Sequence, residues 1–336
     1  MTYLYKELYA SPPTMKLTHI TLCLITILLF GCKNPNSRQT EKDALTVQSK
    51  EAPMVSFTFD DGITADLAGY PFKEWNQMLL SHLEREGLKA TFFVTGQNKL
   101  DERGQFLLKS WNDKGHQIAN HTFSHPNFNA DANTAQMFAD QLLRTDSVIS
   151  KFGNSSKLFR FPYLKEGQNP AKVDSIRNVL AQNGYRNGYV TIDASDWYVN
   201  SRLIKKIKAN GVSDTQFDAF RNFYVQHILE RAAYYENLSY EINGRHIKHT
   251  LLLHHNLTSA LFLGDLIEAF KAKGWKVVDS DKAFEDPIFG QIPSPDFAGE
   301  SLIWSLAKQS GNYEDRLRYP AEDSRYEKEK MDQLAL

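Results

Sequence analysis

This chain of 336 residues has little cysteine and almost no net charge. The two cysteines, Cys23 and Cys32, lie near the N-terminus, before the part of the sequence that predicts folded structure. A disulfide framework within the folded part is therefore excluded. The 39 Lys and Arg nearly balance the 40 Asp and Glu, which gives a formal net charge of -1. The composition therefore indicates neither a basic stripe for nucleic acid nor a strongly acidic face.

Long hydrophobic runs are also rare, and the clearest one, Leu17 to Phe30, is shorter than the roughly 20 residues that cross a membrane. It follows Lys16 and ends at Gly31-Cys32, which is typical of a secretory signal. Residues 1–32 are therefore predicted to be a signal segment, with a short transmembrane anchor as the alternative. Residues 33–52 are polar and predict a flexible tether.

The Gly31-Cys32 junction resembles that of a bacterial lipoprotein signal. This resemblance implies that Cys32 becomes the first residue of the mature protein and carries the lipid. The protein is then expected to be exported and anchored to a membrane, facing the periplasm or the cell surface.

Segments of strand and helix character alternate from about residue 53 onward. The strands are expected at 54–59, 90–94, 117–120, 158–161, 189–192, 248–253 and 275–278. The helices are expected at 75–86, 105–114, 136–152, 173–183, 214–236, 265–273 and 301–309. Repeated βα units predict an α/β fold with a (β/α) barrel or a closely related parallel architecture.

The helix at 214–236 is predicted from Phe217, Phe220, Tyr224 and Ile228, which recur at helical spacing. It belongs to a helical insertion expected at about 200–247. Two interpretations of this helix are open: it packs on the barrel wall, or it borders a substrate cleft.

The end of the chain, residues 286–336, is predicted to form a C-terminal extension. It starts with a proline-rich stretch and contains the helix expected at 301–309. Residues 316–336 are rich in charge and are expected to be mostly solvated.

Two acidic and two imidazole side chains follow predicted strands and suggest a metal site. Asp60 and Asp61 end the first strand, and His121 and His125 follow the strand at 117–120. Adjacent residues of an extended segment point to opposite sides, so the two aspartates can take different roles. One carboxylate and two imidazoles can hold a divalent metal with open positions, and the second carboxylate can act as a base.

Five segments in this order resemble the motifs of the polysaccharide deacetylases, the NodB-homology group also called carbohydrate esterase family four. They are Thr58 to Gly62, His121 to His125, Arg160 to Tyr163, Asp193 to Trp197, and Leu251 to His254. The resemblance places a deacetylase domain at 53–285 and implies a distorted barrel with fewer than eight full units. The insertion and the C-terminal extension lie outside the motifs.

The resemblance also implies roles for the first two segments and for Arg160. Asp61, His121 and His125 would hold the metal. Asp60 would be the general base, and the Arg160 guanidinium would pair with it.

The remaining segments would supply the substrate pocket and the acid. The backbone N–H of Tyr163, after Pro162, would help to bind the oxyanion. Trp197 would wall the acetyl pocket. His254 would protonate the leaving amine, and Asp193 would hold its imidazole and raise its pKa.

Three features of these segments leave alternatives. His255 competes with His254, because a shift of the strand by one residue would exchange them. Asp196 competes with Asp193 in the same way. Leu164 stands where many relatives have Gly, which predicts a differently shaped loop after Tyr163.

The predicted function is metal-dependent removal of acetyl groups from an N-acetylated polysaccharide or cell-wall glycan. The metal is expected to be Zn²⁺, with Co²⁺ or Ni²⁺ as alternatives. An O-acetyl carbohydrate esterase or small-amide hydrolase with the same site, and a non-catalytic glycan-binding module, are the other interpretations. The expected partners are an acetylated glycan and, through the lipid, a membrane; a nucleic acid is not expected.

Overall fold

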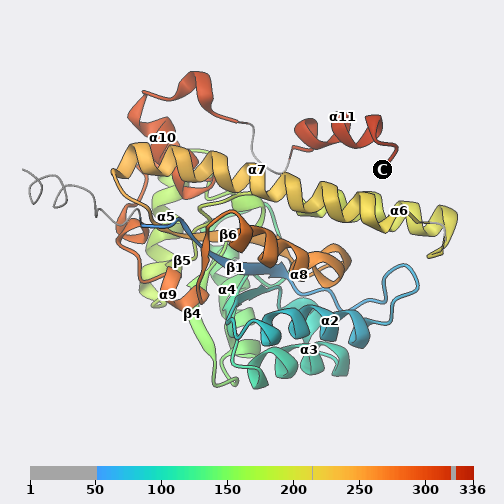
Figure 1. Ribbon diagram of the computed structural model, residues 1–336. Coiled ribbons are helices and arrows are strands. Elements are labelled where there is room, and N and C mark those ends of the chain that lie inside the picture. Colours follow the sequence, from blue (N-terminus) through green and yellow to red (C-terminus); the bar gives the residue numbers. More distant parts are fainter. Residues whose placement is uncertain (1–50, 214, 319–322) are drawn as a thin grey trace, which may run out of the picture. The chain divides into compact units, whose positions relative to one another are not determined.

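The computed structural model describes residues 51–213, 215–318 and 323–336 (Figure 1). The predicted signal, Cys32 and nearly all of the predicted tether lie outside the described residues. Within the described ranges, no helix combines the length and the apolar character that crossing a membrane requires.

A parallel sheet forms the centre of the fold. Its strands are β1 (Met54–Asp61), β2 (Thr91–Val94), β3 (Gln117–Asn120), β4 (Ser155–Phe159), β5 (Arg186–Asn187), β6 (Lys248–His254) and β7 (Lys276–Val277). The order is β5-β4-β3-β2-β1-β6, and β7 pairs with the start of β1. Every pairing is parallel, so the carboxyl ends of the strands meet at one edge.

The strand expected at 189–192 is present only as a single bridge, between Ile192 and Leu251. The chain leaves β5 beside β4, where Gly188 N–H donates to the Phe159 carbonyl, and reaches β6, where Ile192 N–H donates to the Thr250 carbonyl. One segment therefore crosses from one edge of the sheet to the other, and this crossing prevents a regular ladder. The distorted barrel with fewer than eight units is confirmed.

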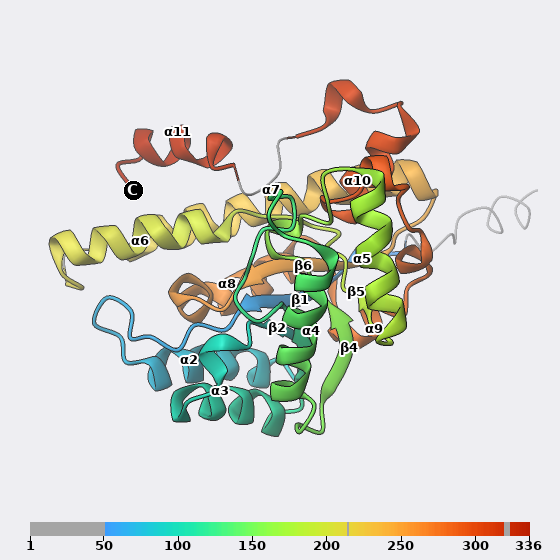
Figure 2. The same ribbon diagram turned by 180° about the vertical axis from the view of Figure 1, so that it is seen from behind.

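Helices cover the sheet (Figures 1 and 2). They are α2 (Phe72–Arg85), α3 (Glu102–Asp113), α4 (Ala135–Ile149), α5 (Pro170–Gln182), α6 (Asp196–Asn210), α7 (Phe217–Asn243), α8 (Leu257–Ala272), α9 (Ser280–Ala283), α10 (Leu302–Ser310) and α11 (Arg325–Gln333). The predicted helices are present, and several start earlier than expected because capping residues lie upstream of the apolar pattern. Asn256, for example, caps α8 by accepting from Ser259 N–H.

The insertion consists of α6 and α7. Phe220, Tyr224 and Ile228 of α7 are fully buried in the main hydrophobic core. Helix α7 packs against α8 and α10, and none of its described residues lines the pocket described below. Of the two interpretations, packing on the wall is the one that the structure supports.

The C-terminal extension belongs to the same core rather than to the solvent. Leu302 and Ile303 of α10 are fully buried, and so is Met331 of α11. Glu327 is also buried, and it accepts from Arg231 of α7 at 2.9 Å. The described residues of 316–336 are mostly exposed or half-exposed, as expected, but the inner face of α11 is buried. The sequence pattern did not reveal this face, because its few buried residues lie among many charged ones.

Candidate active site

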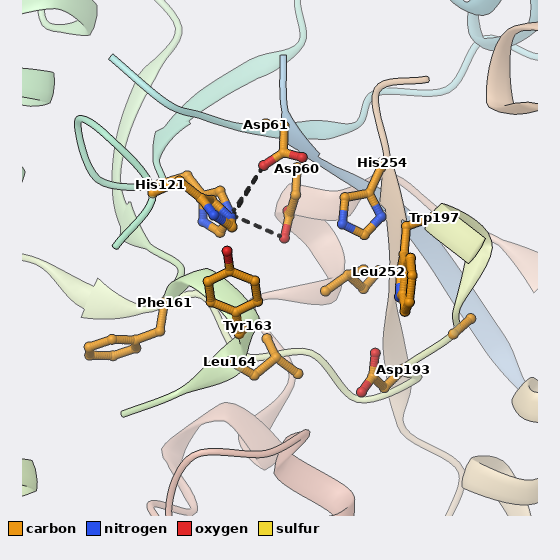
Figure 3. Close-up of a pocket in the computed structure, with 12 residues that line it drawn as sticks. Asp60, Asp61, His121, Phe161, Tyr163, Leu164, Asp193, Trp197, Leu252 and His254 are labelled. Carbon is orange, nitrogen blue, oxygen red and sulfur yellow. Dashed lines mark ion pairs between the residues drawn. The ribbon is translucent and has the colours of Figure 1, made fainter. Parts of the chain in front are cut away.

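The predicted site residues meet at the carboxyl edge of the sheet, around one pocket of about 480 Å³ (Figure 3). Strand β1 ends in Asp60 and Asp61, β3 leads into His121, and β6 ends in His254. The pocket is lined by Asp60, Asp61, His121, His125, Phe161, Tyr163, Leu164, Asp193, Ala194, Trp197, Leu252 and His254. Residues separated by nearly 200 positions therefore form one site because their strands are parallel neighbours.

A candidate metal centre is formed by Asp61, His121 and His125. Asp61 Oδ1 lies 3.7 Å from His121 Nε2 and 3.4 Å from His125 Nε2, and donor atoms of the three residues lie within 4.8 Å of one another. His121 Nδ1 is 2.8 Å from the Arg160 carbonyl and donates to it, which leaves the Nε2 lone pair for an ion. This donor set fits a divalent metal with open coordination positions.

The backbone of this centre is left-handed at two of the three predicted ligands. Asp61 has φ 75° and His125 has φ 60°. The Asp61 carbonyl accepts from Thr95 N–H, and His125 N–H donates to Thr122 Oγ1. Left-handed non-glycine residues are costly unless their surroundings hold them, and they gather at functional sites.

The electrostatics of the centre favour metal-binding forms of its ligands. Burial, together with the neighbouring His121, lowers the pKa of His125 to about 4, so its imidazole is neutral at pH 7. Burial alone would raise the pKa of Asp61, but His254 and the two other histidines outweigh it, and the pKa is lowered. A neutral imidazole and an ionised carboxylate are the states that bind a metal.

Asp60 differs from the three predicted metal ligands because it forms an ion pair with Arg160. Arg160 Nη1 donates to Asp60 Oδ1 at 2.6 Å and to Thr58 Oγ1 at 2.8 Å, while its Nε donates to the Gly188 carbonyl. Both side chains of the ion pair are buried. Asp60 Oδ2 faces the centre, 3.8 Å from His121 Nε2. One oxygen is therefore fixed by the guanidinium, and the other is turned toward the metal ligands.

The predicted pairing of His254 with Asp193 is wrong, because Asp196 takes that position. His254 Nδ1 lies 2.6 Å from Asp196 Oδ1, and Asp196 Oδ2 accepts from the backbone N–H of His254 and from Asn256 Nδ2. Asp196 is the first residue of α6, and the turn into that helix aims it at β6. Asp193 lines the pocket wall farther away, beyond Leu252 (Figure 3).

This pairing raises the pKa of His254. Burial lowers it, but the Asp196 carboxylate overcomes burial and raises it to about 10. The imidazole is therefore protonated at pH 7, with Nδ1 donating to Asp196. Asn256, which steadies Asp196, was missed by the sequence analysis, since an Asn that caps a helix carries no further signal.

His255 points away from the pocket. Its side chain is fully buried, its Nε2 lies 3.0 Å from Asn76 Oδ1, and its ring contacts Trp75 and Phe92. Strand alternation therefore places only His254 in the pocket, as expected.

The pocket has two side walls. Trp197 and Leu252 form one, and Tyr163 and Leu164 form the other (Figure 3). Tyr163 and Leu164 have φ 58° and 59°. Leu164 thus adopts a left-handed backbone form, which glycine takes without strain and leucine does not. The differently shaped loop after Tyr163 stays a prediction.

The Tyr163 ring contacts one of the predicted metal ligands, His125. This ring lies 4.7 Å from the His125 ring in an edge-on contact. The Tyr163 side chain is 47% exposed, so it stands at the mouth of the pocket.

Residues 48–188 match the family model of polysaccharide deacetylase. This part of the chain is therefore similar to a polysaccharide deacetylase domain. The matched region contains the metal donor set but ends before Asp196 and His254, which join the site only through the fold.

Curated relatives share part of their length with this chain. A peptidoglycan-N-acetylglucosamine deacetylase of Bacillus cereus is 31% identical over 144 residues, which are 43% of this chain and 46% of that protein. The peptidoglycan-N-acetylmuramic acid deacetylase PdaA of Bacillus subtilis is 28% identical over 177 residues, which are 52% of this chain and 60% of that protein. The chain thus spans about half of the length of these relatives.

Among solved structures, the chitin deacetylase of Colletotrichum lindemuthianum aligns with 70% of this chain and 89% of its own chain. The TM-score is 0.49 and the sequence identity is 19%.

Proposed function

We propose that this protein is a metal-dependent deacetylase that removes acetyl groups from an N-acetylated polysaccharide or cell-wall glycan. The observation that carries the proposal is that Asp60 and His254 line the same pocket beside the metal donor set. Arg160 holds Asp60 from behind, and Asp196 holds His254. Water adds to the amide carbonyl carbon, the C–N bond breaks, and acetate and a free amine result.

A divalent ion held by Asp61, His121 and His125 would polarise the amide carbonyl and lower the pKa of water. Asp60 accepts the proton of the attacking water on Oδ2, while Arg160 keeps Oδ1 in place. His254 donates the proton on its Nε2 to the leaving amine nitrogen. Asp196 holds the imidazole by accepting a hydrogen bond from Nδ1.

The pocket walls have complementary roles in this proposal. Trp197 and Leu252 present an apolar surface that suits the acetyl methyl group. The backbone N–H of Tyr163, which follows Pro162, is proposed to help bind the oxyanion. No covalent intermediate with the protein is needed, since water is the nucleophile.

We propose Zn²⁺ as the metal, because one carboxylate and two imidazoles suit it; Co²⁺ and Ni²⁺ are alternatives with the same donor preference. The substrate class is an acetylated cell-wall glycan, which the names of the curated relatives support.

Acetate release from a panel of substrates tests the proposal. Peptidoglycan, chitin oligomers and an O-acetylated xylan are compared, each with and without prior removal of metal by a chelator. Metal-dependent release from an N-acetylated glycan is expected. Full activity of metal-free protein would contradict the mechanism, release from the xylan alone would favour the esterase, and glycan binding without release would favour a binding module.

We also propose that the protein is exported and anchored through a lipid on Cys32. The support is the sequence alone, together with relatives that are named for cell-wall substrates. Cys32→Ser is expected to move the protein from the membrane to the soluble exported fraction. If fractionation still finds the variant in the membrane, the segment before Cys32 is itself the anchor.

A further inference from the structure

A fully buried lysine contacts the turn that carries the predicted metal ligand Asp61. Lys99 ends the short 3-10 helix η1 (Gln97–Lys99), which follows β2, and its side chain is inaccessible to solvent. Its Nζ donates to the carbonyls of Gly62 at 2.7 Å, Thr95 at 3.1 Å and Asp61 at 3.2 Å. A fourth acceptor is Asn98 Oδ1 at 2.5 Å. All four acceptors are uncharged oxygens.

Two glycines make room for this lysine. A Cβ at Gly62 would lie 2.8 Å from Lys99 Cε and 2.9 Å from Nζ. A Cβ at Gly104, in the first turn of α3, would lie 2.3 Å from Lys99 Cα. Both distances are shorter than real Cβ contacts. The absence of a side chain at Gly62 leaves room for the end of the Lys99 side chain, and its absence at Gly104 lets α3 approach the backbone of residue 99.

The ammonium holds the turn that presents a predicted metal ligand. Asp61 and Gly62 are both left-handed, with φ 75° and 76°. Lys99 binds the carbonyls of both residues, and Thr95 donates to the Asp61 carbonyl through its N–H and its Oγ1. A buried amino group is costly unless its hydrogen bonds are made. Here they are made to the Asp61-Gly62 turn and to the segment that follows β2.

We propose that Lys99 is a positioning residue for the metal centre: it ties the Asp61-Gly62 turn to the end of β2 and thereby sets the metal affinity of the site. The inference rests on the proposed metal site. It goes beyond the five motif segments, none of which contains Lys99. A role in general stability predicts a different outcome, because it would lower the unfolding free energy without changing how the folded protein binds metal.

The test measures Zn²⁺ and Co²⁺ affinity of the metal-free full chain by calorimetry, together with urea unfolding. Lys99→Met keeps the length of the side chain and removes the charge and the donors. Lys99→Gln keeps an N–H donor. Lys109→Met, on the exposed face of α3, is the matched control.

Lys99→Met is expected to bind metal about 10–100-fold more weakly, which is the usual effect of losing a residue that orients a metal ligand. Lys99→Gln is expected to recover part of that loss, and Lys109→Met to bind like the unchanged protein. Unchanged affinity in either folded Lys99 variant would overturn the inference, as would failure of both to fold, since Lys99 would then serve the whole fold. If the unchanged protein binds no metal, the proposed site is itself wrong.

Discussion

At the scale of single residues, neighbours in the sequence have different chemistry because they meet different partners. Asp60 is buried against Arg160, whereas Asp61 faces two imidazoles. The φ of 75° at Asp61 marks the point where the strand ends and the chain turns. This turn separates a candidate base from a candidate metal ligand.

Exchanging these residues one at a time should separate the two roles. His125→Ala is expected to lose the metal, since it removes one of three donors. Asp60→Asn is expected to keep the metal but to lose about 10²-fold or more in turnover, the scale of a general base. Metal content and acetate release measure both, with Asp140→Asn, an exposed site on α4, as the control. Metal loss in Asp60→Asn, with full turnover after refilling, would mean that the two aspartates have exchanged roles.

The choice between Asp196 and Asp193 can be tested by the pH dependence of kcat/KM. The general acid must be protonated, so activity is expected to fall as pH rises through the His254 pKa of about 10. Asp196→Asn removes the charge that raises this pKa, and burial then lowers it. The alkaline limb should therefore move to below about pH 7, the range of an unassisted histidine. Asp193→Asn should leave the limb in place; a shift in Asp193→Asn alone would restore the original assignment.

At the scale of elements, the periodicity of buried residues placed the strands and helices, but it did not reveal which exposed-looking helices are covered. Helix α11 has charged residues on most positions, yet Glu327 and Met331, four apart, face α7 and the core. Arg202 of α6 donates to Asp332 at 2.6 Å and adds a second connection. The end of the chain is therefore part of the wall that carries the insertion.

Truncating the buried side chain of α11 should lower stability. Met331→Ala is expected to reduce the free energy of unfolding by about 2–5 kcal/mol, the range for large-to-small changes in a core. Glu329→Ala, on the exposed face of the same helix, should change it by less than about 0.5 kcal/mol. Urea unfolding of the two variants is the measurement. Equal stability of both would mean that α11 does not stay docked in solution.

At the scale of the whole molecule, His116, His227 and His255 are among the described histidines outside the metal centre that are buried in their neutral form. Burial lowers the pKa of His116 and of His227 to about 3, and it lowers the pKa of His255 well below its usual value. His116 Nδ1 accepts from Ala90 N–H, which requires the neutral ring. The unfolded chain binds protons at these positions near pH 6.5, and the folded chain does not.

The fold should therefore lose stability in mild acid. The three neutral rings contribute their full share of the unfolding free energy above pH 6.5, and this share is lost as pH falls from 6.5 toward 3. The unfolding free energy then falls by up to about 4 kcal/mol per pH unit, because three protons are taken up on unfolding. Unfolding of metal-free protein between pH 7 and 4 measures the slope. His116→Asn keeps an acceptor for Ala90 N–H but does not titrate, so its slope should be shallower by about one proton. An unchanged slope would mean that His116 is protonated in the fold.

Much of the site was predictable from the sequence, because local rules place its residues. Apolar runs end where polar residues follow, and parallel strands bring those ends to one edge. This reasoning was enough to bring together Asp60, Asp61, His121 and His254. Alternation indicated that only one of His254 and His255 faces the pocket, and the resemblance to the polysaccharide deacetylases selected His254. The same local pattern located most of the barrel strands. It missed the two-residue β5, and it predicted a strand at 189–192, where the chain crosses between sheet edges.

Only the tertiary structure decided the features that depend on distant segments. The turn into α6 selects Asp196 rather than Asp193 as the partner of His254, since both follow the same strand-like segment and differ only in how the loop ends. Lys99 can be buried because Gly62 leaves room for the end of its side chain and Gly104 leaves room for its backbone, and these two glycines are far apart in sequence. Side-chain periodicity reports the face of an element, whereas these contacts depend on which other element covers that face.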